Sequence, residues 1–314
     1  MSIFTKRFIC LCLLLLQYSP VSPLTLVYNM RVRRIFQINP SADIAHALWA
    51  FSAVPIYYRR DRHIVVPSEA TNVHDMSRMY GTLLNLRYIG TRNWWFEATT
   101  GIEEERYRAC GTTNIKASRG GFDDLLFSIG HNKAFGQAGQ SAVYIIGGIP
   151  IHKKVTLQER FGPLVGTRFY SLGAGAELSW TFINTLEKTC STFLQGRFLH
   201  FFNRKWFPIL PVTAKIQPGN TADLLIGIQY RKKLNIFEIG YNPTLFANQA
   251  INLATEKIKT NAFVSNNIYG SLEHICKECS FLNKPLIGTG LSLSYSDFFK
   301  TKSFAWWVSF TAFF

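Results

Sequence analysis

The chain has 314 residues, of which 15% are aromatic and only 17% are charged, and its formal net charge at pH 7 is +15. Ordinary globular proteins carry about 25% charged residues, whereas few charges and many aromatic residues are typical of a membrane β-barrel with an apolar outer face and a polar lumen. The positive charge does not indicate nucleic-acid binding, because the basic residues fall mostly at expected rims, as in Arg59-Arg60-Asp61-Arg62. We expect these to be solvated turn residues; the alternative is contact with anionic head groups or lipopolysaccharide phosphates.

A short apolar run lies near the N-terminus, at 8–16, and follows Lys6 and Arg7. It is far below the ~18 residues that a membrane-spanning helix needs, so we expect residues 1–25 to be a secretory signal peptide. No other apolar run approaches that length, which excludes an α-helical membrane protein. The basic segment 26–45 is expected either to remain in the periplasm or to fold into a barrel as a plug.

The remaining chain, 46–314, is rich in segments that alternate between apolar and polar residues. This period of two predicts strands with two different faces. About twelve strands are expected, at 46–58, 80–90, 93–105, 122–131, 141–150, 165–182, 190–202, 221–231, 233–242, 260–274, 285–296 and 303–314. Two are irregular, since 46–58 has apolar residues on both faces and 260–274 places Asn266 among apolar positions.

The expected connections alternate in length along the chain. The long ones are 59–79, 106–121, 151–164, 203–220 and 243–259, and 297–302 is the exception. The short ones are 91–92, 132–140, 183–189, a turn near Lys232, and 275–284. Outer-membrane barrels have long extracellular loops and short periplasmic turns. In a soluble β-sandwich there is no physical reason for the lengths of successive connections to alternate. The sequence therefore predicts an all-β fold, an antiparallel transmembrane β-barrel of about 12 strands.

The stretch 304–314 carries apolar residues at every even position, including Phe310, Ala312 and Phe314. An edge strand of a soluble sandwich is the alternative reading. A terminal Phe preceded by this pattern resembles the assembly signal of Gram-negative outer-membrane β-barrel proteins. The resemblance implies export to the outer membrane, contact with its lipid and lipopolysaccharide, and recognition by the outer-membrane assembly machinery.

A second resemblance involves 166–178, which reads Gly-Thr, then aromatic residues, then Leu-Gly-Ala-Gly. This segment is similar to a strand of porin-like outer-membrane transporters of the phenol-degradation and fatty-acid type. The similarity covers this one segment and implies a transport function without naming a subfamily.

Aromatic residues lie near the ends of the expected apolar faces. Interfacial girdles of membrane barrels are built from such residues. We expect this girdle to include Trp94, Trp180, Tyr230 and Tyr295.

The opposite faces of the strands carry charges of both signs. The sequence predicts a porin-like channel or transporter through which small solutes diffuse passively. Its expected selectivity residues are Arg87, Glu97, Glu177, Arg197, Asp223 and Arg231. A barrel of about twelve strands is narrow, so a structural or surface-interaction barrel with an occluded lumen is the alternative.

An enzyme is not expected. A rim hydrolase would need clustered Asp and His residues, for which His74-Asp75 and Asp123-Asp124 are the candidates, but a His-Asp dipeptide in a loop is usually just solvated. No phosphate-binding loop, zinc-protease helix or nucleophile elbow is visible, and nothing indicates a cofactor.

Four cysteines lie beyond the signal peptide. Cys276 and Cys279, with His274, offer three ligands where zinc needs four, so a disulfide within this turn is expected in an oxidising compartment. Cys110 and Cys190 fall at opposite rims of the expected barrel and are predicted not to pair.

Overall fold

The structure is a computed structural model of the 314-residue chain. It describes residues 48–66, 71–90, 93–110, 115–136, 138–151, 169–185, 187–209, 212–248, 250–252, 257–259, 261–276, 285–297 and 300–314. The expected signal peptide and the 26–45 segment lie outside the described residues. Within the described part there is no helix both long and apolar enough to cross a membrane.

Strands dominate the described residues. The first nine are β1 (Leu48–Val66), β2 (Thr71–Ile89), β3 (Trp94–Cys110), β4 (Ile115–Phe122), β5 (Leu125–Phe135), β6 (Gly139–Ile149), β7 (Ser171–Asn184), β8 (Lys188–Phe201) and β9 (Arg204–Ile209). The others are β10 (Val212–Gln217), β11 (Thr221–Lys232), β12 (Asn235–Tyr241), β13 (Thr244–Phe246), β14 (Ala250–Asn252), β15 (Lys257–Lys259), β16 (Phe263–Ile275), β17 (Leu286–Ser296) and β18 (Thr301–Phe313).

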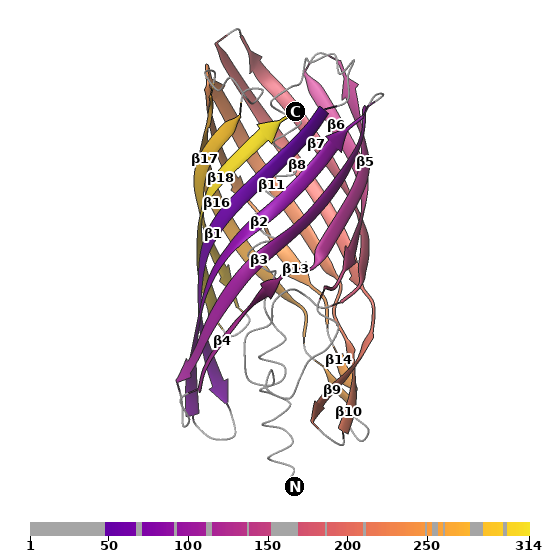
Figure 1. Ribbon diagram of the computed structural model, residues 1–314, viewed down its shortest axis with the longest axis vertical. Helices are drawn as coiled ribbons and strands as arrows, with labels where there is room; N and C mark the ends of the chain where they lie inside the picture. The colour runs from indigo at the N-terminus through magenta and orange to yellow at the C-terminus, as the bar shows by residue number, and fades with distance from the viewer. Residues whose placement is uncertain are drawn as a thin grey trace.

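The main sheet closes on itself into a twelve-stranded antiparallel barrel, as predicted (Figure 1). Neighbours along the chain pair with each other, β8 pairs with β11, and β18 returns to pair with β1. At the seam, Trp49 and Phe314 exchange two backbone hydrogen bonds, of 3.1 and 2.9 Å. Closure leaves the main sheet without a free edge, which is what a β-structure needs to cross a bilayer.

Two of the twelve barrel strands are each made of two segments. β4 and β5 both pair with β3 and are separated by Asp123 and Asp124, which are buried. β12 and β13 both pair with β11 and β16 and are separated by Asn242 and Pro243. The pairing register is the same on both sides of the second interruption, so β12 and β13 follow one line across the barrel wall.

The prediction of long loops is wrong for several connections, because their residues continue as paired strands. β1 and β2 extend through most of 59–79 with unbroken pairing from Leu48–Ile89 to Val66–Thr71. β3 and β4 likewise extend into 106–121. β9, β10, β14 and β15 form a separate four-stranded sheet from the connections 203–220 and 243–259. These extensions lie at the end of the barrel opposite the short turns (Figure 1).

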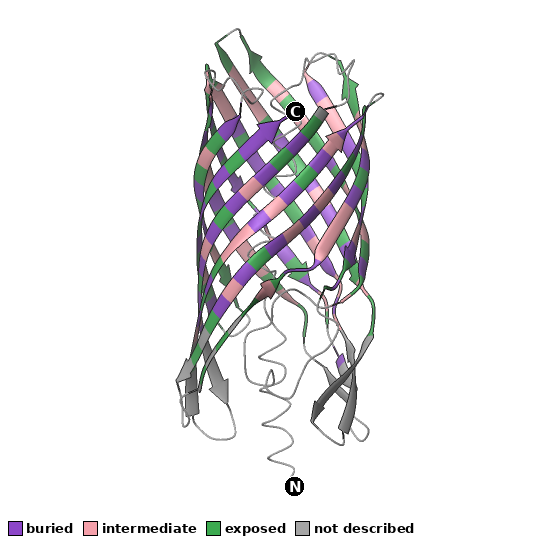
Figure 2. Ribbon diagram, in the orientation of Figure 1, coloured by how far each residue is buried: buried purple, intermediate pink, exposed green. Residues whose placement is uncertain are grey.

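Burial alternates along the strands with a period of two (Figure 2). The outward face is apolar, as at Val143 and Ile145, which are 59% and 57% exposed. The inward face of β1 also carries apolar residues such as Val54 and Ile56, which explains why this strand is apolar on both sides. Asn266 lies among outward positions on β16, where the Tyr241 hydroxyl donates a 2.5 Å hydrogen bond to its Oδ1.

Inward aromatic rings pack directly on glycines of the next strand. Trp307 lies opposite Gly290, and a Cβ at Gly290 would overlap its indole ring. The same arrangement pairs Trp95 with Gly130, Tyr144 with Gly175, Phe193 with Gly227, and Tyr269 with Gly240. The aromatic rings line the barrel wall, because the glycine opposite each ring has no Cβ and the ring can lie against its backbone.

Of the two predictions about disulfides, one is confirmed and the other is wrong. Cys190 is a free thiol, so it does not pair with Cys110. The disulfide expected within the 276–279 turn is not formed, because Cys276 is also a free thiol. Cys276 instead extends the ladder, its backbone N–H donating to Pro285 O at 2.9 Å. Cys279 lies outside the described residues.

We predict that Gly290→Ala lowers the free energy of unfolding by about 1–3 kcal/mol, because the added methyl group overpacks the site under the Trp307 ring. Gly196→Ala is the matched control, since a Cβ there meets nothing within 4 Å. Urea unfolding of the barrel refolded in lipid vesicles measures both. Equal stability of the two variants would contradict the packing described for Gly290.

Candidate functional site

The inner wall of the barrel collects most of the buried charge. Among the side chains that the structure describes, the buried arginines are Arg60, Arg62, Arg87 and Arg197. The buried carboxylates are Glu97, Glu103, Glu105, Asp123, Asp124, Glu177, Asp223, Glu238 and Glu273. Carboxylates therefore exceed arginines on this wall, although the whole chain carries a net charge of +15.

Two of the predicted selectivity residues, Arg87 and Glu97, form an ion pair between β2 and β3. They are directly opposite in the register, their Nη2 and Oε2 atoms are 2.5 Å apart, and both residues are fully buried. The Arg87 guanidinium also lies 4.6 Å from the centroid of the Trp95 ring, within the range of a cation–π contact. The aromatic ring thus holds this pair against the wall.

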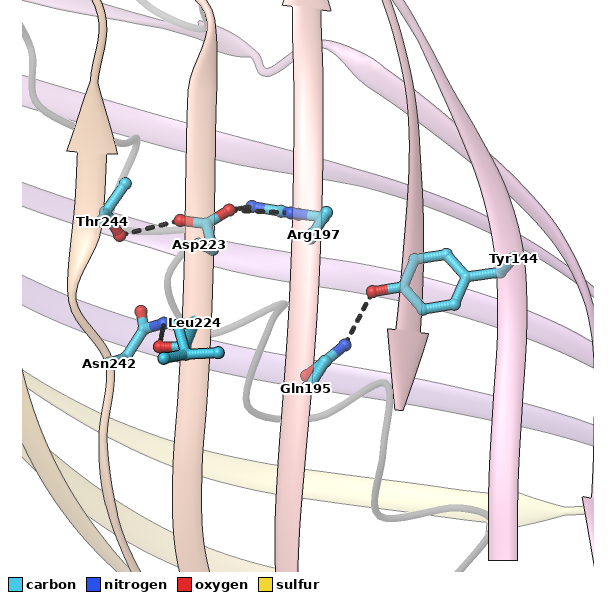
Figure 3. A network of polar contacts seen from close by, with 7 residues as sticks. All are labelled: Tyr144, Gln195, Arg197, Asp223, Leu224, Asn242 and Thr244. Atoms are coloured by element: carbon cyan, nitrogen blue, oxygen red, sulfur yellow. Dashed lines mark hydrogen bonds and ion pairs between the residues drawn. The ribbon is translucent and has the colours of Figure 1, made fainter. Parts of the chain in front are cut away.

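Arg197 and Asp223 form a second ion pair on the other side of the barrel, between β8 and β11 (Figure 3). Arg197 donates to Asp223 Oδ2 from Nε at 2.9 Å and from Nη2 at 2.5 Å. The Thr244 hydroxyl donates to the other carboxylate oxygen, Oδ1, at 2.7 Å. Nearby, Gln195 Nε2 donates to the Tyr144 hydroxyl at 2.8 Å. Three neighbouring barrel strands therefore share one polar network around Asp223.

The other two predicted selectivity residues lie apart from these pairs. Glu177 is buried on β7, opposite Gln195. Arg231 is half-buried near the short-turn end of β11, where its Nε donates to Lys233 O at 3.1 Å. The structure thus brings together two pairs from the predicted set and leaves two members separate.

A band of polar residues runs across the inner wall from β7 round to β1. It has two rows, each following the cross-strand register. The first row is Glu177, Gln195, Asn242, Asn267, Ser294, Ser303 and Arg60, with Leu225 between Gln195 and Asn242. The second row is Arg197, Asp223, Thr244, Ser265, Ser296 and Thr301. We call these two rows the polar band.

Apolar side chains border the polar band on both sides. Towards the long extensions lie Leu199, Phe246 and Phe263, the last two stacked with ring centroids 4.6 Å apart. Towards the short turns lies the next row, which contains Phe193 and Tyr269. The band is therefore a defined polar strip within a wall that is otherwise partly apolar.

Three amides of the polar band were not singled out from the sequence. Asn242 and Asn267 lie directly opposite each other, since Tyr241 pairs with Ile268 and Thr244 with Ser265. Gln195 lies two strands away in the same row. Their inward positions follow from strict alternation with apolar neighbours such as Ile268, but their proximity needs the register of three strands.

The basic cluster expected at a solvated rim divides between the two faces of β1. Arg60 and Arg62 point inward and are buried, and Arg60 Nη2 lies 3.5 Å from Glu105 Oε1. Arg59 points outward and pairs with Asp61 at 3.1 Å. The expectation of solvated turn residues is wrong because this stretch is a strand, whose successive side chains point to opposite faces.

The candidate hydrolase motifs do not meet. His74 is exposed on β2, opposite Cys110, whereas the Asp123 N–H donates to Gly101 O further along β3. Gly101 and Cys110 are nine positions apart on β3, a distance of about 30 Å along the strand. Across the part of the chain that the structure describes, no three His, Cys, Asp or Glu side chains are grouped to hold a metal ion.

The expected girdle residues occupy outward positions near strand ends. Trp94, Trp180 and Tyr295 are exposed, and Tyr230 is half-exposed. Of the expected assembly-signal residues, Phe310 and Phe314 are exposed outward, while Ala312 is covered and pairs with Phe51 of β1.

The comparisons with known proteins identify the fold. No protein-family model matches the chain, and no curated protein does. An outer membrane channel from Pseudomonas putida F1 has a similar structure, with 11% identity and a TM-score of 0.57 over 84% of this chain and 95% of that one. The transport unit of the autotransporter AIDA-I from Escherichia coli has 8% identity and a TM-score of 0.52, over 87% and 92%. The fold is that of outer-membrane β-barrels.

We predict that Asp223→Leu lowers the free energy of unfolding by about 3 kcal/mol, because it leaves the buried Arg197 guanidinium without its carboxylate. The double variant Arg197→Met/Asp223→Leu recovers part of this loss, since no unpaired charge remains. Asp61→Leu, at the exposed pair with Arg59, is the control and costs at most about 1 kcal/mol. Urea unfolding in vesicles measures the stability of all three variants. A double variant less stable than Asp223→Leu would show that the unpaired Arg197 charge is not the cause of the loss.

Proposed function

We propose that this protein is an outer-membrane channel or transporter through which small solutes diffuse passively along a polar lumen. The observation that carries the proposal is the inner wall, which holds the two ion pairs and the amides and hydroxyls of the polar band, while apolar residues face outward. Polar lumen linings of this kind suit aqueous permeation. The fold shared with an outer membrane channel supports it.

In this proposal the short turns and Phe314 face the periplasm, and the extended hairpins face the outside of the cell. The outward apolar surface contacts outer-membrane lipid, and exposed basic residues of the extensions, such as Arg78 and Arg106, contact lipopolysaccharide phosphates. Arg87, Glu97, Glu177, Arg197, Asp223 and Arg231 act as the selectivity residues.

The charge balance of the wall suggests the sign of the selectivity. Nine carboxylates against four arginines, among the described buried residues, give an excess of negative charge. A lumen lined mainly by carboxylates favours cations. The channel is therefore proposed to prefer cations over anions.

We predict steady single-channel conductance with a cation-selective reversal potential when the refolded barrel is inserted in a planar bilayer. Glu177→Gln lowers the cation-to-anion permeability ratio, because it removes one negative charge from the lumen. Glu104→Gln makes the same change on a side chain that is 46% exposed and points outward, and leaves the ratio unchanged. An anion-selective channel, or equal effects of both substitutions, would contradict the proposed selectivity.

A specific observation favours the alternative of a structural or surface-interaction barrel with an occluded lumen. Trp307, Arg62, Arg87 and Tyr269 are among the bulky inward side chains with less than 2% of their surface exposed. A barrel with heat-modifiable gel mobility that passes no current would favour this alternative and overturn passive diffusion.

The proposed assembly signal at Phe310, Ala312 and Phe314 gives a further prediction. Phe314→Ala slows insertion by the assembly machinery, because it removes an exposed ring at the seam. The fraction of heat-modifiable barrel in cell membranes measures this. Phe122→Ala, an equally apolar exposed ring at the far end of β4, is the control, and a similar defect in both variants would refute the special role of Phe314.

A further inference from the structure

The polar band contains amide groups with unused hydrogen-bonding capacity. Among the described residues, neither Oδ1 nor Nδ2 of Asn267 has a hydrogen-bond partner, although the residue is only 3% exposed. Asn242 Nδ2 donates to Leu224 O at 2.9 Å, but no described residue bonds to its Oδ1. Gln195 Nε2 donates to the Tyr144 hydroxyl, and its Oε1 likewise has no partner among the described residues. An unpartnered buried amide costs about 1–3 kcal/mol, so three in one row require an explanation.

These amides are held in one row on the barrel wall. Asn242 N–H donates to Asn267 O at 2.7 Å, which fixes the two residues side by side on neighbouring strands. Gln195 lies further along the same row, with the side chain of Leu225 between it and Asn242. Figure 3 shows Gln195 and Asn242 on the same side of the wall as the ion pair of Arg197 and Asp223. All these side chains point into the barrel.

The free groups define the chemistry of a ligand. They are three carbonyl oxygens, which accept hydrogen bonds, and one NH₂ group, which donates. The neighbouring charges of Arg197 and Asp223 already neutralise each other. A complementary ligand is uncharged and carries several hydroxyl groups, because each hydroxyl both donates and accepts.

We infer that Gln195, Asn242 and Asn267 form a binding station for small neutral polyhydroxylated solutes, such as a monosaccharide, on the inner wall of the barrel. The inference rests on the proposed channel function and names the class of solute that the lumen recognises. Bound hydroxyl groups donate to the three amide oxygens, and one accepts from Asn267 Nδ2. The apolar borders at Phe246 and Tyr269 limit the station to the band.

The test measures binding of glucose to the refolded full-length barrel by equilibrium dialysis. Triethylene glycol dimethyl ether is the matched probe, since it has a similar mass but no hydroxyl group. Glucose is expected to bind and the ether is not. Asn267→Leu and Asn242→Leu each weaken glucose binding about three- to tenfold, the effect of losing one or two hydrogen bonds. Equal binding of glucose and the ether overturns the inference.

Asn85→Leu is the control variant. Asn85 is also buried on the inner wall, but its Nδ2 already donates to Thr99 Oγ1 at 2.7 Å, outside the polar band. This substitution lowers stability in urea and leaves glucose binding unchanged. Asn267→Leu is expected to keep or raise stability, because it removes an amide that has no hydrogen-bond partner among the described residues. If Asn267→Leu instead lowers stability and leaves glucose binding unchanged, the role of Asn267 is structural and the inference is overturned.

Conductance separates this inference from the proposed function. Glucose binding that depends on Asn242 and Asn267 in a barrel that passes no current supports the station and overturns the channel. Steady conductance without amide-dependent glucose binding supports the channel and overturns the station. If Asn267→Leu does not fold, Asn242→Leu and the comparison of the two probes decide the result.

Discussion

Closure of the sheet is the constraint on which the rest of this structure depends. A bilayer offers no water to an unpaired N–H or C=O group, so every backbone group of a spanning strand needs a partner within the protein. The reciprocal hydrogen bonds of Trp49 and Phe314 mark the seam where β18 meets β1. Once the seam is closed, the alternation of side chains sends one face of every strand to the lipid and the other to the interior.

The interior created by closure is not uniform. Five large aromatic rings lie against glycines of neighbouring strands, and this packing keeps bulky residues such as Trp307 close to the wall. Ion pairs between adjacent strands neutralise much of the charge, as between Arg87 and Glu97. Between these features runs the polar band, whose amides carry hydrogen-bonding groups without a partner in the described part of the chain. The inner wall therefore combines a structural lining with a strip that has the chemistry to receive a solute.

The sequence predicted the barrel class, the approximate strand count and the inward or outward position of most residues, because a period of two is a local property of the chain. It was wrong about the long connections, since 59–79 and 106–121 continue as paired strands. A strand can carry charged residues on its outer face, as β1 does with Arg59 and Asp61. The same error placed Arg60 at a solvated rim rather than beside Glu105.

The sequence by itself determined that the chain has two-faced strands, with an apolar outer face and charges such as Arg197 and Asp223 on the other. Only the tertiary structure decided which inward residues meet. The register between strands places Asn242 opposite Asn267, and the circular order of strands brings β1 beside β18. Register and closure are collective properties of the whole sheet, because each strand is positioned by both neighbours, so no local pattern reports them.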